Sequence, residues 1–236
     1  MPGFALAKKA AEVYEEDPSV EGLILLGHGH FAFGQTAEKS YNQIISHTQT
    51  VADYFNLENP TALNVKASHS SHGVLPVIRG LIAEMIGPNA AMPIIDVRNG
   101  PEEMKFLKRD DLESLSERGT ASPDHVIRIK GRPLVLRKSV WEQGRSAIKE
   151  ALKDYEIEYK AMFERQAPKA AQPKTILPPD PKTIWMEGVG LLGLGANFKS
   201  ASIAGDLVVQ NARVRSVGED AGGFYPIGEK DLFDCE

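Results

Sequence analysis

The stretch Gly27-His28-Gly29-His30-Phe31-Ala32-Phe33-Gly34 decides how this chain is interpreted. It follows the apolar run Gly22-Leu23-Ile24-Leu25-Leu26 and precedes a helical pattern that begins near Thr36. An apolar run without alternation is typical of a short buried strand. A histidine between such a strand and a helix is held by fixed backbone, so its imidazole is aimed at one place. The sequence therefore predicts a strand over residues 22–27, a glycine corner, and a helix over residues 36–56.

The same order of elements returns near the end of the chain. Residues 183–186 predict a strand, residues 188–195 form a second glycine corner, and residues 197–217 predict a helix. The corners align by pairing Gly29 with Gly190, Gly34 with Gly195, His28 with Val189, and His30 with Leu191. We interpret the second corner as a degenerate duplicate that kept the backbone and lost any metal ligand.

The composition indicates an ordinary globular protein. The 236 residues are 42% hydrophobic and 25% charged, which is enough for one large domain or two small ones. The net charge of −5 comes without a basic stripe, so no nucleic-acid partner is expected. The apolar runs are far shorter than the roughly 20 residues that span a bilayer. With no signal-peptide pattern and one cysteine, Cys235, the sequence predicts a cytoplasmic protein without an internal disulfide.

The rest of the chain divides at its prolines and glycines. Apolar spacing predicts helices over 4–17, 73–86, 102–116 and 139–165, strands at 94–97, 126–129 and 134–136, and a tail over 218–236 with little periodicity. The strands at 126–129 and 134–136 are expected to flank a turn. Pro76 is tolerable in the second of these helices because it falls in the first turn.

Two motifs near these elements could be functional or purely structural. The imidazoles of His28 and His30 would point the same way on an extended strand, but a zinc site needs three protein ligands. Gly188-x-Gly190-x-x-Gly193 matches the dinucleotide fingerprint locally. Too little chain follows it for a βαβαβ unit, and the alignment of the two corners explains its glycines, so we assign no nucleotide there.

Other histidines are weaker candidates. His69 and His72 flank two serines ahead of a helix, where Ser70 or Ser71 would serve as the N-cap and the histidines would be solvated. Asp124-His125 lies at the expected entry to a strand, where neighbours point to opposite faces. His125 therefore remains a minor candidate.

Residues 22–41 resemble the class II aldolase/adducin family, most closely the aldolase part of bifunctional aldolase/short-chain dehydrogenases of the rhamnulose-1-phosphate type. The resemblance continues through residues 118–128, the corner at 188–195 and the ending Asp231-Leu232-Phe233-Asp234. It therefore covers most of the chain, and the first stretch is the most specific part.

The resemblance implies one metal ligand in this chain. In that family the histidine of this corner is the last of three zinc-binding histidines, which corresponds to His28. The family usually has an apolar residue where His30 stands, so His30 is not assigned. Zinc acts there as a Lewis acid and stabilises the charge that develops as a carbon–carbon bond breaks. The other zinc histidines, the acid/base glutamate and the phosphate loops precede the position where this chain begins, so no catalytic residue is assigned.

The resemblance also implies an α/β fold with the layered sheet and flanking helices of class II aldolases, incomplete at the N-terminus. Residues 1–165 would be the C-terminal part of an aldolase-like domain with a helical extension. Residues 166–182 would be a linker rich in proline and alanine, and residues 183–236 the degenerate repeat with a tail.

Three functions stay open at this point. The first is a zinc-dependent lyase that reversibly cleaves ketose 1-phosphates to dihydroxyacetone phosphate and an aldehyde, with weak or no activity in this chain alone. The second is a non-catalytic, adducin-like module that acts through an oligomeric or interdomain surface. The third is a segment of a bifunctional aldolase/short-chain dehydrogenase, and so of an oxidoreductase. We favour the first, which implies a sugar-phosphate substrate and leaves a homo-oligomer open.

Overall fold

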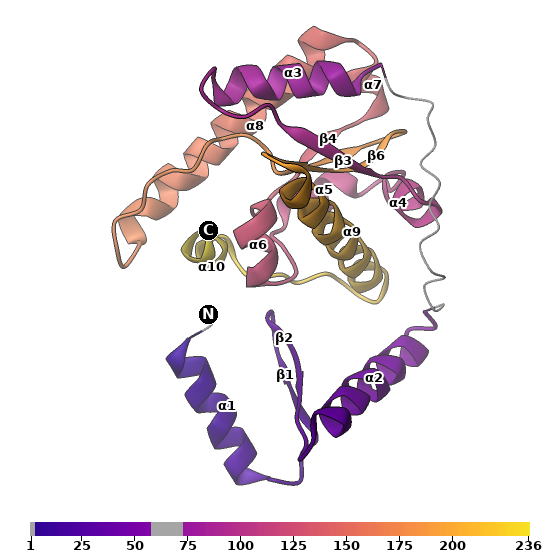
Figure 1. The fold of residues 1–236 in the computed structure, drawn as a ribbon, viewed down its shortest axis with the longest axis vertical. Coiled ribbons are helices and arrows are strands. Elements are labelled where there is room, and N and C mark those ends of the chain that lie inside the picture. The colour runs from indigo at the N-terminus through magenta and orange to yellow at the C-terminus, as the bar shows by residue number, and fades with distance from the viewer. Residues whose placement is uncertain (1–2, 58–72) are drawn as a thin grey trace.

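The computed structural model describes residues 3–57 and 73–236. The first range contains four elements, namely α1 (Phe4–Glu16), β1 (Gly22–Leu25), β2 (Gly29–Ala32) and α2 (Ala37–Tyr54). We call these four elements the N-terminal unit. β1 and β2 form an antiparallel two-stranded sheet. In Figure 1 this unit lies at one end of the molecule, and its hairpin points toward α6 (Pro123–Ile129) and α10 (Glu229–Cys235) of the larger body.

The larger body is built on a four-stranded mixed sheet in the order β3-β6-β5-β4. Its strands are β3 (Ile94–Arg98), β4 (Leu134–Leu136), β5 (Thr183–Met186) and β6 (Gly190–Gly195). β6 pairs antiparallel with both β3 and β5, whereas β4 pairs parallel with β5. The expected α/β class is confirmed by this mixture of helices and sheet.

Helices cover both faces of this sheet. On one face, α3 (Leu75–Ile86) and α8 (Arg145–Gln166) pack Ile82 and Leu152 against Leu192 and its neighbours. On the other face, α4 (Pro101–Phe106), α5 (Leu112–Glu117) and α9 (Phe198–Asp220) pack around Trp185 and Leu191. Pro76 lies in the first turn of α3, as expected.

The N-terminal unit differs from this body, because residues 3–57 include no buried side chain.

The strand expected at 126–129 is wrong. Residues Pro123–Ile129 form the helix α6, with the proline in its first turn. A proline there has φ already set for a helix and loses no needed N–H group. Val126 and Ile129 are buried while Ile127 is 59% exposed, which is the spacing of a helix face rather than the alternation of a strand.

Both glycine corners are also corrected. The structure has a β-hairpin at each place, because a second strand, β2 or β6, follows the turn before the helix begins. The first strand and the helix of each unit were expected correctly, with small shifts at their ends; they are β1 and α2, and β5 and α9.

Three further boundaries differ from the expectation. The helix expected at 102–116 is two short helices, α4 and α5. The helix expected at 139–165 divides into α7 (Lys138–Trp141) and α8 at Gly144, whose φ is +94°. The chain after residue 166 has one turn of 3₁₀ helix, Ala167–Lys169, and ends in α10 (Glu229–Cys235), where little periodicity was expected.

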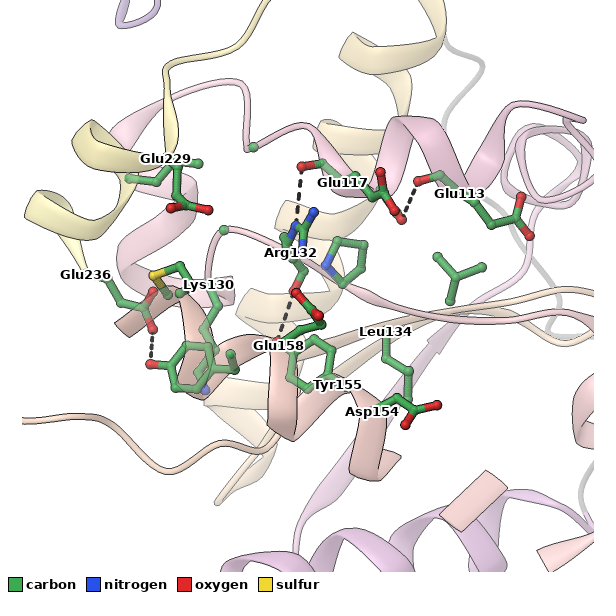
Figure 2. A pocket seen from close by; sticks show the side chains of 18 of the residues that line it. Glu113, Glu117, Lys130, Arg132, Leu134, Asp154, Tyr155, Glu158, Glu229 and Glu236 are labelled. Carbon is green, nitrogen blue, oxygen red and sulfur yellow. Dashed lines mark hydrogen bonds between the residues drawn. The ribbon is translucent and has the colours of Figure 1, made fainter. Parts of the chain in front are cut away.

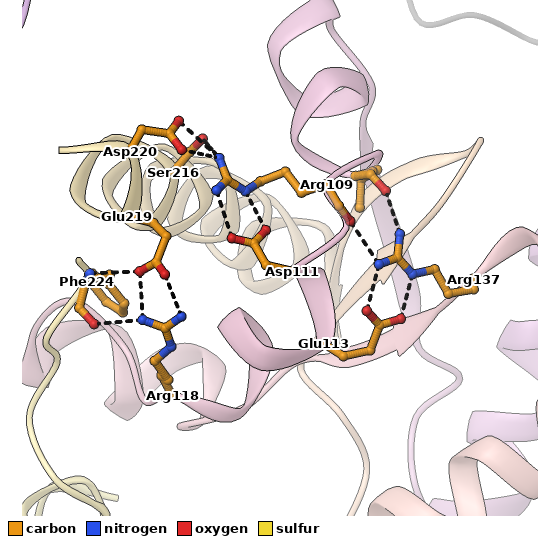
Figure 3. Close-up of polar contacts among 10 residues, drawn as sticks. Arg109, Asp111, Glu113, Arg118, Arg137, Ser216, Glu219, Asp220 and Phe224 are labelled. Atoms are coloured by element: carbon orange, nitrogen blue, oxygen red, sulfur yellow. Dashed lines mark hydrogen bonds and ion pairs between the residues drawn. The ribbon is translucent and has the colours of Figure 1, made fainter. Parts of the chain in front are cut away.

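Three arginines tie the segment around α5 to its neighbours, as Figure 3 shows. Arg118 donates two hydrogen bonds to the Glu219 carboxylate on α9, at 2.7 and 2.8 Å. Arg109 binds both Asp111 and Asp220, and Arg137 binds Glu113. The pairs of Arg109 and Arg118 hold the C-terminal end of α9 beside α5, and the pair of Arg137 ties the end of β4 to α5. Within the part of the chain that the structure describes, no helix is both long and apolar enough to cross a membrane.

Candidate functional site

The two hairpins have the same register. Gly22 pairs with Ala32 in the first, and Thr183 pairs with Gly193 in the second, an offset of 161 residues on both strands. The helix caps follow the same offset, since the side chain of Thr36 accepts from Lys39 N and that of Asn197 accepts from Ser200 N. The alignment made from the glycines and the order of elements therefore holds for the whole strand–turn–strand–helix unit.

Glycine is needed at the same position of both turns. Gly27 has a φ of +67° and Gly188 a φ of +80°, a region that side chains with a Cβ rarely adopt. The residue after each glycine donates its N–H to the last residue of the first strand, with His28 N 3.0 Å from Leu25 O and Val189 N 3.1 Å from Met186 O. His28 and Val189 therefore occupy equivalent positions.

The glycines of the apparent dinucleotide fingerprint are explained by packing. A Cβ on Gly190 would lie 2.7 Å from Arg98 O on β3, and a Cβ on Gly193 would lie 2.3 Å from Gly205 N on α9. The turn leads into a second strand rather than into a helix. The local geometry is therefore not that of a dinucleotide-binding strand–turn–helix.

His28 lies half-buried in the turn of the first hairpin. Its Nδ1 is buried and makes no hydrogen bond within the structure. Its ring stacks on Phe31, with centroids 6.1 Å apart. The side chain lines a cavity of about 210 Å³ together with Leu26, Pro123, Ile227 and Asp231. This nitrogen is buried beside a cavity and has no hydrogen-bond partner among the described residues. A neutral imidazole nitrogen in such a place can donate its lone pair to a metal ion.

His30 points elsewhere. Its Nε2 lies 3.0 Å from Nδ1 of His47 on α2, and His47 Nε2 lies 3.8 Å from a Glu21 carboxylate oxygen. The equivalent residues of the second unit, 161 positions after His30 and His47, are Leu191 and Val208, and these two pack in the same core cluster. The structure thus gives His30 a strand-to-helix contact and does not bring it together with His28.

His125 lies in the first turn of α6 rather than at a strand entry. It is buried, and its Nδ1 lies 2.8 Å from Ser122 Oγ. Burial lowers the pKa of His125, so the imidazole is held neutral. His69 and His72, with the caps expected at Ser70 or Ser71, lie outside the described residues.

The described residues do not make a complete zinc site. No group of three or more His, Cys, Asp or Glu side chains within residues 3–57 and 73–236 is placed to hold a metal ion. Zinc in a catalytic site takes three protein ligands and an open position. His28 can supply one of these ligands and no more.

A larger cavity of about 590 Å³ lies between α8, α10 and the loop before β4, and Figure 2 shows its lining. Lys130 is buried there. Its backbone has a φ of +62°, which is unusual for a residue with a side chain. Its Nζ donates to Pro178 O at 2.6 Å and lies 3.7 Å above the ring of Tyr159. Tyr159 Oη in turn donates to the Glu236 carboxylate.

The electrostatics of Lys130 follow from this burial. The Asp180 carboxylate forms its ion pair with Lys182, at 2.7 Å, and not with Lys130. Burial lowers the pKa of Lys130 to about 8, and Asp180 opposes that shift. The cavity thus holds an amine that is partly neutral in mildly alkaline solution. Sequence reasoning missed it, because Lys130-Gly131-Arg132-Pro133 has the composition of an ordinary turn. The two cavities share no lining residue.

Comparison with known proteins identifies the class. The family model described as "Aldolase class II, second domain" matches residues 69–236, more than half of the chain. The chain therefore belongs to the class II aldolase family, which confirms the resemblance at the level of the family. It is also similar to the uncharacterized oxidoreductase YuxG of Bacillus subtilis (strain 168), at 25% identity over 250 residues. That alignment takes in 100% of this chain and 35% of YuxG, so the chain spans about a third of its curated relative. No solved structure matches the chain significantly.

Proposed function

We propose that the chain is part of a metal-dependent lyase that reversibly cleaves a ketose 1-phosphate, of the rhamnulose-1-phosphate type, to dihydroxyacetone phosphate and an aldehyde. The observation that carries this proposal is His28. It stands in a glycine-framed turn with a buried, unpartnered Nδ1 beside a cavity, and it matches the family's third zinc histidine. Family membership supports the reaction class. The rhamnulose-type substrate, zinc and a cytoplasmic location are parts of the proposal.

Activity in this proposal needs residues beyond the described ones. One imidazole holds zinc weakly and cannot fix its geometry. The remaining ligands, the acid/base group and the phosphate contacts would come from outside the described residues. We accordingly expect the 236 residues alone to be weakly active or inactive. We also propose that residues 1–165 are an aldolase-like part with a helical extension, 166–182 a linker, and 183–236 a copy of the hairpin unit with a tail.

A second candidate is supported by the name and length of the relative. YuxG is described as an oxidoreductase, and this chain aligns with 35% of it. The chain would then be the aldolase segment of a longer bifunctional aldolase/short-chain dehydrogenase. In that case the hydride-transfer chemistry would belong to the other part of the polypeptide.

A chimera tests the proposal. This chain replaces the aligned stretch of YuxG, and the product is assayed for release of dihydroxyacetone phosphate from ketose 1-phosphates. We expect cleavage that is lost in His28→Ala and retained in His30→Ala, the matched control two residues away. An active chimera that keeps its rate after His28→Ala would contradict the role given to His28. A folded chimera that cleaves no ketose 1-phosphate would contradict the reaction class.

A further inference from the structure

The two hairpins are one structure in two environments. In the body, β5 and β6 are the inner strands of the sheet, with β4 parallel beside β5 and β3 antiparallel beside β6. In the N-terminal unit, β1 and β2 pair only with each other among the described residues. Within residues 3–57 and 73–236, β1 and β2 thus lack the two outer neighbours that β5 and β6 have.

The outer edge of β2 presents backbone groups that need partners. Phe33 N donates to Glu21 O at 3.4 Å, and facing groups alternate along an antiparallel pair. His30 and Ala32 therefore turn their backbone groups outward, away from β1. Ser40 Oγ on α2 already donates to Ala32 O at 2.9 Å, which satisfies one outward carbonyl within the unit.

The equivalent groups in the body are paired with another strand. The counterparts of His30 and Ala32 are Leu191 and Gly193, which stand opposite Arg98 and Asp96 of β3. A free edge of this kind is a template for a further strand.

The side chains of the N-terminal unit also lack cover. Of the twenty exposed large hydrophobic residues in the described part of the chain, twelve lie within residues 4–57. Ile24 is 74% exposed, whereas its counterpart Trp185 is 1% exposed. Phe31 is 49% exposed, whereas its counterpart Leu192 is fully buried. An apolar surface gathered on one unit in this way marks an interface.

We propose that β1 and β2 are the inner pair of a second four-stranded sheet, whose outer strands come from the rest of a longer class II aldolase polypeptide. The added strand beside β2 runs antiparallel to it, as β3 does to β6. The added strand beside β1 runs parallel to it, as β4 does to β5. The family model of a second domain begins at residue 69, after this unit, and the relative is almost three times as long as the chain.

The geometry favours this occupant over a second copy of the chain. A two-fold axis beside β2 would supply an antiparallel neighbour. The same operation beside β1 also gives an antiparallel strand, whereas the counterpart of β1 takes a parallel one. The inference rests on the family assignment and not on zinc, so failure of His28 as a ligand leaves it unchanged.

Hydrogen exchange tests the proposal on the chain alone and on the YuxG chimera. We expect the peptide spanning residues 22–34 to exchange about 100-fold more slowly in the chimera. The equivalent peptide over residues 183–195 serves as an internal control, because its edges are already paired and its exchange should not change. Purified YuxG itself provides a second measurement, at the peptide aligned with residues 22–34, which should be protected.

A pair of proline variants locates the edge. Ala32→Pro removes an outward N–H from β2, which an edge strand tolerates but a central strand does not. Ala37→Pro is the matched control, since it falls at the first position of α2, where the N–H has no helical partner. In the chimera we expect the protection of residues 22–34 to be lost in Ala32→Pro and kept in Ala37→Pro.

Three results would overturn the proposal. The first is equal exchange of residues 22–34 in the chain, in the chimera and in YuxG. The second is protection in the chain alone that rises with its concentration, because a second copy would then occupy the edge. The third is protection in the chimera that survives Ala32→Pro.

Discussion

Replacing Gly193 with alanine probes a close contact between β6 and α9. An added Cβ would lie 2.3 Å from Gly205 N and 2.7 Å from Ala201 O, and both atoms belong to the backbone of α9. Neither can move alone, so the whole helix must shift away from the sheet, where its Val208 and Ala212 pack with Trp185 and Leu191. The same position in the first hairpin is Ala32, so only the body has this close approach.

The size of the effect follows from two opposing terms. Overpacking a core costs about 1–3 kcal/mol, and a clash with helix backbone falls at the upper end. Restricting the unfolded chain by a glycine-to-alanine change returns about 0.5–1 kcal/mol. The free energy of unfolding should therefore fall by about 2 kcal/mol, which lowers Tm by about 4–8 °C in a protein of this size.

Urea and thermal unfolding followed by tryptophan fluorescence measure this difference. Gly80→Ala is the control, since nothing lies within 4 Å of its added Cβ within α3. It should raise stability by about 0.5–1 kcal/mol. If Gly193→Ala were as stable as Gly80→Ala, the packing of α9 on β6 described above would be wrong.

Three further predictions concern buried charge, an ion pair and the histidine pair. Lys130→Met keeps the stem of the side chain but not the amine. Because burial penalises the charged amine, the wild type should gain stability relative to this variant as the pH rises from about 8 to about 10.5, measured by urea unfolding across that range. A stability gap that stays constant with pH would contradict it. The hydrogen bond from Arg109 holds the pKa of Asp111 below its usual value. Asp111→Asn should therefore cost about 0.5–1 kcal/mol at neutral pH after solvent screening, a loss that disappears as acid protonates the wild-type carboxyl. The double variant His30→Leu with His47→Val recreates the contact of Leu191 with Val208 and should stabilise the N-terminal unit by about 1 kcal/mol. Slower hydrogen exchange over α2 checks this, and faster exchange would show that the histidine contact is required.

The sequence revealed the repeat because glycine spacing survives where side chains change. The pairing of Gly29 with Gly190 and of Gly34 with Gly195, within the same order of elements, aligned two units whose strands share one register. The local sequence pattern could not distinguish a β-hairpin from a turn that leads directly from a strand into a helix. A glycine such as Gly27 allows positive φ in either, and only the pairing of the strands decides between them.

Tertiary packing explains the other differences. Val126-Ile127-Arg128-Ile129 has the β-branched composition of a strand. The helix forms instead because Pro123 is favourable in its first turn, and because helical spacing buries both Val126 and Ile129. The burial of Lys130 has no sequence signature, since it depends on Pro178 and Tyr159, which lie far along the chain. His28 as a metal ligand stays a prediction carried by the family resemblance and by its unpartnered nitrogen.

The central claim is that His28 is one ligand of a metal site that other parts of the protein complete. The zinc content of the purified 236-residue chain, measured after dialysis against metal-free buffer, tests this most directly. We predict far less than one zinc per chain, in the wild type and in His28→Ala alike. One tightly bound zinc per chain that survives His28→Ala would contradict the account.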